Sequence, residues 1–198
     1  TTQIKKVIGV LTSSILKMPK GLYFSNNHTW TFLEKSGKAQ VGLDDLLQHI
    51  VGEVKFTNFK NPGDIIKKGD VLTQINQSGK LLMIFAPISG KVLEINSLLS
   101  DNPEILNSDP YEKGWIYKIE PTNWTAETSS YYLAEDAKSW ATKELERFKD
   151  FVAVSVEKHS PAPSMVALQD GGELRDNTLS SLPDEIWQDF QKEFLTLA

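Results

Sequence analysis

Short strand-like segments follow one another at close spacing between Leu22 and Ile119. Apolar and polar residues alternate within them, and Gly, Pro, Asn and Asp separate them. The expected strands cover residues 28–34, 39–43, 53–59, 71–76, 81–86, 90–96 and 115–120. Many short strands at such close spacing favour a small barrel or sandwich. We therefore predict a mainly β fold here.

Helical patterns flank this β region. Residues 4–17 place apolar side chains at helical spacing and end before Pro19 and Gly21, which predicts an amphipathic helix. Residues 131–157 predict a long helix. Ser181 and Asp184 fit a capping signature for a last helix from Pro183 to about Leu195. The expected organisation is an N-terminal helix (1–20), a β domain (21–124), a long helix (125–158), and a linker with a C-terminal helix (159–198).

Composition excludes several classes of function. The chain has no cysteine, so disulfides and thiol catalysis are excluded. Its net charge is −5 and it has no basic stripe, so we expect no nucleic-acid partner. His28, His49 and His159 share no ligand spacing, so we expect no metal site. No nucleophile elbow, phosphate loop or dinucleotide glycine pattern is present, so we expect no catalytic activity.

The chain shows no apolar run long enough for a membrane helix. We therefore expect a cytoplasmic protein without a transmembrane segment. The first residues are Thr1-Thr2, without Met, so an upstream signal or anchor segment stays open.

Specific motifs give the β region a family resemblance. They are 28-HTW-30, 41-VGLDD-45, 51-VGEV-54, 62-PGDIIKKGD-70, 86-APISGKVLEIN-96 and 101-DNPEILNSDPYEKGWIYKIEP-121. From Leu22 to Trp140 the sequence resembles the H-protein of the glycine cleavage system, a relative of lipoyl domains. The resemblance implies a barrel-sandwich hybrid, in which two small antiparallel sheets pack face to face.

The same resemblance marks a departure at the carrier position. H-proteins bear lipoate on a lysine within a Glu-Ser-Val-Lys stretch at a hairpin tip. Counting back from Pro87 without gaps, that stretch falls on Asn76-Gln77-Ser78-Gly79, and the lysine position is Gly79. The family's Glu after the histidine of the His-Glu-Trp motif is Thr29 here. Residues that carry the fold match the family, whereas those that carry its chemistry do not.

Lys80 is the candidate cofactor-bearing residue nearest to that position. It is a solvated turn lysine, a lipoylated lysine in a slipped hairpin register, or part of a turn that binds another protein. A shift of one residue reverses the direction of a side chain in a strand, which argues against lipoate on Lys80. Gly79 fits the apex itself, because glycine supplies the positive φ of a tight turn. We therefore expect no cofactor.

Two further patterns have structural interpretations. Asp44 and Asp45 are expected to cap a helical turn over residues 44–51. Trp187, Phe190 and Phe194 form an apolar stripe that we expect to dock onto the chain's own surface, joined by Val7 and Leu11. The run 170-DGGEL-174 resembles tails of H-protein-like chains from anaerobic bacteria that lack the lysine.

These features predict a bacterial, non-catalytic H-protein-like module that binds a protein partner or serves assembly. The alternative is a lipoate-bearing H-protein that shuttles the aminomethyl group among the glycine cleavage components. Residues 76–80 distinguish the two.

Overall fold

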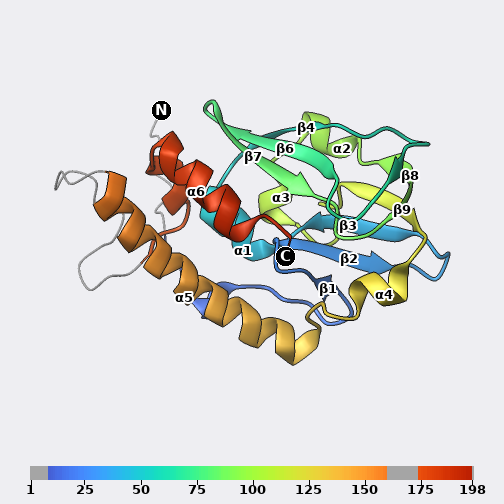
Figure 1. Ribbon diagram of the computed structural model, residues 1–198, viewed down its shortest axis with the longest axis horizontal. Coiled ribbons are helices and arrows are strands. Elements are labelled where there is room, and N and C mark those ends of the chain that lie inside the picture. Colours follow the sequence, from blue (N-terminus) through green and yellow to red (C-terminus); the bar gives the residue numbers. More distant parts are fainter. Residues whose placement is uncertain (1–8, 160–173, 198) are drawn as a thin grey trace, which may run out of the picture.

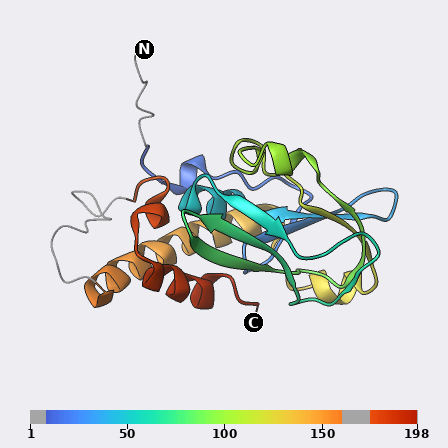
Figure 2. The ribbon, with the colours of Figure 1, turned by 90° about the horizontal axis from the view of Figure 1, so that it is seen from above.

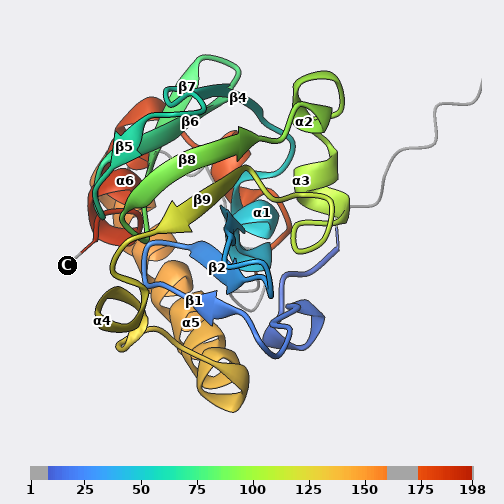
Figure 3. The ribbon, with the colours of Figure 1, turned by 90° about the vertical axis from the view of Figure 1, so that its right-hand side faces the viewer.

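Two antiparallel sheets form the centre of the molecule in a computed structural model, which describes residues 9–159 and 174–197. The six-stranded sheet has the order β1-β2-β3-β9-β8-β5, and the three-stranded sheet the order β4-β6-β7. Their bounds are β1 Tyr23–Phe24, β2 Thr29–Leu33, β3 Ala39–Leu43, β4 Lys55–Asn58, β5 Ile65–Ile66, β6 Val71–Gln77, β7 Lys80–Phe85, β8 Gly90–Ile95 and β9 Tyr117–Pro121. Figure 3 shows the three-stranded sheet above the other. The prediction of a mainly β, barrel-sandwich fold with flanking helices is confirmed.

Helices cover the ends of this pair of sheets. They are α1 Asp45–Val51, α2 Leu98–Asp101, α3 Ile105–Ser108, α4 Trp124–Thr128, α5 Ala134–His159 and α6 Asp184–Phe194, with 3-10 turns η1 Ser13–Ile15 and η2 Thr178–Ser181. In Figures 1 and 2, α5 and α6 lie side by side at the end of the molecule away from β8 and β9.

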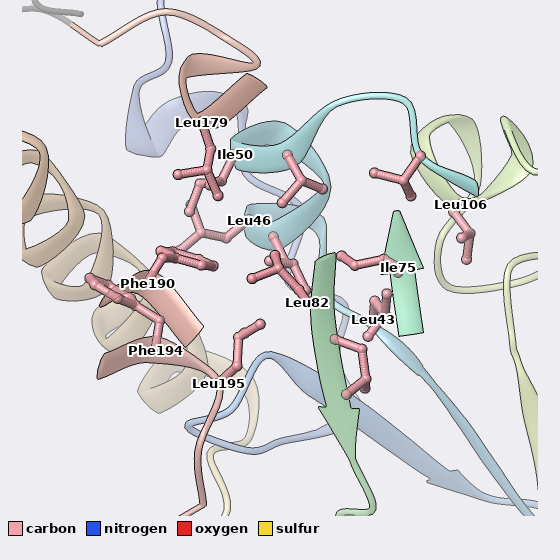
Figure 4. Close-up of a cluster of buried hydrophobic side chains, with 14 of the residues drawn as sticks. Leu43, Leu46, Ile50, Ile75, Leu82, Leu106, Leu179, Phe190, Phe194 and Leu195 are labelled. Atoms are coloured by element: carbon pink, nitrogen blue, oxygen red, sulfur yellow. The ribbon is translucent and has the colours of Figure 1, made fainter. Parts of the chain in front are cut away.

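The β region and the C-terminal segment share one core. A single cluster of buried apolar side chains joins the sheets, α1, α5 and the C-terminal segment. Figure 4 shows Leu82 of β7 and Leu46 of α1 beside Phe190 and Phe194 of α6. Trp187, Phe190 and Phe194 are almost completely buried, so the prediction that the C-terminal stripe docks internally is confirmed. Leu11 belongs to the same cluster, whereas Val7 lies outside the described residues.

The predicted N-terminal helix is wrong over residues 9–17. Val10 forms an antiparallel bridge with Arg175, and the backbone N–H of Leu11 donates to the carbonyl of Leu174 over 2.7 Å. The short turn η1 follows. A helix of this length is marginal alone, so pairing with the C-terminal segment decides the local conformation.

The long helix begins later than residue 125. α4 ends at Thr128, and α5 starts only at Ala134. In between, Tyr132 exchanges two backbone hydrogen bonds with Phe24 of β1, each 2.9 Å long. Residues that add to a sheet edge cannot continue a helix, because their backbone groups are already bonded outward.

The predicted capping role of Ser181 is also wrong. Its hydroxyl donates to the carbonyl of Thr178 over 3.0 Å, within η2. α6 begins at Asp184, after Pro183, and has no side-chain cap. Ser181 thus belongs to the preceding turn. At α1, by contrast, the Asp44 carboxylate accepts from the backbone N–H of Leu47 over 2.8 Å, which confirms its predicted cap.

Candidate functional site: the hairpin between β6 and β7

The hairpin tip is a two-residue turn made by Ser78 and Gly79. Gln77 pairs with Lys80 across it, and both turn residues have positive φ, 53° and 87°. This twist matches that of the flanking strands, and the turn is stabilised by a 2.9 Å hydrogen bond from the Gly79 N–H to the Asn76 carboxamide oxygen. A Cβ on Gly79 would meet nothing within 4 Å. The tip therefore points into open space and carries no side chain at its second position.

Lys80 points away from that tip. It is the first residue of β7, and its ammonium donates to the carbonyl of Ser180 over 2.8 Å and to that of Leu182 over 3.0 Å. The same nitrogen lies 5.2 Å from the centre of the Trp187 ring. Burial lowers the pKa of Lys80, partly offset by Asp184. Lys80 is thus bound to the C-terminal segment.

The outer edge of β7 is covered by one side chain of α6. The Met83 N–H donates to the carboxamide oxygen of Gln191 over 2.6 Å, and the Gln191 amide nitrogen donates to the Met83 carbonyl over 3.1 Å. A primary amide offers one acceptor and two donors, so it can satisfy a strand residue much as a neighbouring strand would. The edge of β7 is closed at Met83.

A groove of about 520 Å³ lies on the other side of the hairpin. Polar side chains line most of it. The lining residues are Glu53, Val54, Lys55, Asn76, Gln77, Ser78, Pro103 and Glu104. Three of the four positions at which this chain departs from the family's lipoate stretch therefore face this groove.

A buried charged cluster ties the six-stranded sheet to α5. His28 lies between two carboxylates, with its Nδ1 2.9 Å from Asp44 and its Nε2 3.0 Å from Glu144. Burial alone would lower the pKa of His28, but the two carboxylates outweigh it and raise that pKa to about 9. Arg147 contacts Glu144 over 2.6 Å. Burial raises the pKa of Glu144, but His28 and Arg147 outweigh that and lower it to about 2. The cluster joins the six-stranded sheet to α5, and its two positive and two negative side chains balance in charge.

Sequence reasoning missed this cluster. His28 and Glu144 are 116 positions apart, and no local pattern links them. The left-handed backbone of His28, with φ of 66°, gives no signal in the sequence either. Asp44 was recognised only as a cap, and its second role appears only in the folded chain.

Thr29, where the family has Glu, also has a structural role. Its side chain is fully buried and donates to the Asn27 carboxamide oxygen over 2.7 Å. Ser25 lies 2.7 Å from the same hydroxyl, and the Asn27 amide donates to the carbonyl of Phe85 at the end of β7. This small cluster joins β2 to the hairpin and leaves no carboxylate at position 29.

No helix within residues 9–159 and 174–197 is both long and apolar enough to cross a membrane.

Comparison with known proteins identifies the family. A sequence model described as "Glycine cleavage H-protein" matches residues 22–144. The "Probable glycine cleavage system H protein" of Thermococcus kodakarensis is 37% identical over 125 residues, which cover 63% of this chain and 90% of the relative. The "Glycine cleavage system H protein" of Psychrobacter cryohalolentis is 39% identical over 106 residues, which cover 54% of this chain and 84% of the relative.

A solved structure, that of a glycine cleavage system H protein from Mycobacterium marinum, is 24% identical with a TM-score of 0.49, and covers 53% of this chain and 87% of its own. The relatives come from different groups of organisms, so the expected bacterial source stays a prediction. The matched region spans both sheets, the hairpin and α5 as far as Glu144, which contacts His28. This chain belongs to the glycine cleavage H-protein family.

Proposed function

We propose that this chain is an H-protein-like module that carries no lipoate and works by binding a protein partner or by serving assembly, without catalytic activity of its own. The observation that carries the proposal is that neither Gly79 nor Lys80 presents a free lysine side chain at the hairpin tip. Gly79 has no side chain to modify, and the Lys80 ammonium is bound to two carbonyls of the C-terminal segment.

The limited access to Lys80 supports the same proposal. A lipoyl carrier must present its lysine to a modifying enzyme and then to partner active sites. Here Lys80 lies against Trp187, and Gln191 occupies the β7 edge. Modification of Lys80 would require its ammonium to leave the carbonyls of Ser180 and Leu182, at the cost of those hydrogen bonds.

The alternative function is that of a lipoate-bearing H-protein that passes the aminomethyl group among glycine cleavage components. It is favoured by the names of the relatives and by the open space around the tip. In this alternative Lys80 would leave the C-terminal segment and enter the turn.

Intact-mass measurement tests the choice. The chain is expressed with a lipoate ligase and free lipoate, beside a lysine-bearing H-protein that shows the ligase is active. We expect the unmodified mass. A mass increase that peptide sequencing assigns to Lys80, and that Lys80→Arg abolishes, would establish the alternative function instead.

A converse variant tests whether the tip could still be modified. Gly79→Lys combined with Ser78→Val and Asn76→Glu restores the family's residue types at three of the four positions, with Gln77 unchanged. Any modification of this variant is expected to be partial, because φ of 87° at position 79 is unfavourable for a residue with a Cβ, and Asn76 no longer holds the turn.

A further inference from the structure

Each histidine of the chain bonds a carboxylate on another element. His28 contacts Glu144 of α5, His49 of α1 contacts Asp176, and His159 at the end of α5 contacts Asp189 of α6. The pairs of His49 and His159 hold the segment that begins at Leu174. That same segment provides the carbonyls that bind Lys80.

The pair formed by His49 and Asp176 joins this segment to α1 of the β domain. Its Nδ1 lies 2.6 Å from the Asp176 carboxylate and its Nε2 lies 3.3 Å from that of Asp45. The His49 and Asp176 side chains are 25% and 29% exposed, so protons can reach them. The backbone N–H of Asn177 adds a 2.7 Å hydrogen bond to the carbonyl of His49.

The protonation state of His49 decides how many of these contacts can form. A doubly protonated imidazole donates from both nitrogens, so it can satisfy Asp45 and Asp176 together. A neutral imidazole has one N–H, and the second carboxylate then faces a lone pair. Asp45 is already engaged elsewhere, since its carboxylate accepts from the backbone N–H of Lys17 over 2.9 Å. Loss of a proton therefore weakens the contact to one of the two aspartates.

We propose that residues 175–177 form a proton-dependent latch on α1, closed when His49 carries two ring protons and opened locally when it loses one, so that Asp176 and Asn177 leave His49. The flanking residues Leu174, Leu179 and Leu182 stay docked in this motion, as does α6, because their apolar side chains are buried in the core independently of charge. Lys80 therefore keeps its contacts with this segment. The latch is a local opening rather than a detachment of the tail.

The direction of the pH response follows from His49. Hydrogen bonding to Asp45 and the charges of Asp45 and Asp176 raise its pKa above the ordinary value of 6.5, against the effect of burial. The stabilisation is fully present below pH 6.5 and is lost as pH rises through the higher pKa of the folded state. At the other end of the segment, His159 and Lys158 share Asp189. These contacts join α5 to α6, so they do not act on residues 175–177 directly.

Backbone amide hydrogen exchange measured by NMR on the whole chain between pH 5.5 and 9 tests the latch. The reporter is the amide of Asn177, which bonds the carbonyl of His49. The reference is the amide of Ile116, which bonds Val41 in the sheets. After correction for intrinsic rates, the protection of Asn177 should fall relative to Ile116, by about tenfold for each unit by which the pKa of His49 exceeds 6.5. The midpoint should match the titration of the His49 ring signals.

His49→Gln and Asp176→Asn provide the controls. Both keep hydrogen-bonding side chains at partly exposed positions, and both should remove the pH dependence of Asn177 while leaving Ile116 protected. Should one variant fail to fold, the other still tests the claim. Protection of Asn177 that stays constant relative to Ile116 in the wild-type chain, or that falls equally in Asp176→Asn, would overturn the proposal.

Discussion

β4 and β7 are the two outer strands of the three-stranded sheet, and they differ in what lies beside them. On β7, Gln191 bonds both backbone groups of Met83, and Lys80 reaches the carbonyls before α6. On β4, Lys55 and Thr57 are exposed, and within the described residues β6 is its one strand partner. Open strand edges invite pairing with other chains, and an edge lysine reduces that tendency.

The two edges differ because one is covered by a segment that lies outside the family match. The family match ends at Glu144, and the side chains that close the β7 edge come from residues beyond it. The β4 edge and its groove keep their access to solvent. Substitutions at the covered β7 edge should therefore cost more stability than substitutions at the open β4 edge.

Of the substitutions considered, Trp187→Ala, behind the covered β7 edge, should reduce the stability of the protein most. The indole is fully buried and donates to the carbonyl of Leu179 over 2.8 Å, so the variant leaves a large cavity and an unpaired acceptor. We expect a loss of about 3–5 kcal/mol in the free energy of unfolding, measured by urea denaturation. Deleting residues 159–198 should likewise lower the melting temperature. Unchanged stability in both cases would mean that the tail does not contribute to the core.

Raising the pH should loosen the attachment of α5. The pKa of His28 is raised to about 9 in the folded chain, so its stabilising contribution is present below about pH 6.5 and is lost as pH rises through 9. Between pH 6.5 and 9.5 the free energy of unfolding should fall by about 3 kcal/mol from this group.

Glu144→Gln is the control for this pH response. The variant removes one of the two carboxylates that raise the pKa of His28, so it should be less stable at pH 6.5 and lose less stability on the way to pH 9.5. An equal decline in the two proteins would show that other groups cause it.

Gln191→Ala should open the β7 edge at Met83 without emptying the core. Two hydrogen bonds to the strand are lost, and we expect a cost of about 1–2 kcal/mol together with faster exchange of the Met83 amide. Lys55→Ala on the open β4 edge is the matched substitution, with an expected change within about 0.5 kcal/mol. Similar costs at both sites would remove the contrast between the edges.

Gly79→Ala should have the smallest effect. The turn needs φ of 87° there, which costs an alanine about 1 kcal/mol, while the open space around the tip prevents any clash. Urea denaturation measures this cost, and hydrogen exchange should show the change confined to residues near the turn. A larger loss would indicate that the tip contacts other parts of the chain.

Local chemistry allowed much of the fold to be predicted. The Ser78–Gly79 turn, the Asp44 cap and the buried stripe of α6 depend on residues close together in the chain. The periodicity of the strands likewise depends on neighbours two positions apart. Family motifs placed the missing lysine at Gly79, where the structure has the hairpin tip.

Long-range contacts decided the rest. Residues 9–11 are extended because they meet residues 174–176, and Tyr132 leaves the helical pattern because it pairs with Phe24. Lys80 contacts carbonyls about a hundred residues away, and Glu144, across a similar separation, adds to the effect of Asp44 in raising the pKa of His28. The sequence determined the local turns, caps and apolar faces, since these arise from neighbouring residues. Only the tertiary structure decided which side chains meet across the core, because burial pairs charges and backbone groups that lie far apart in the chain.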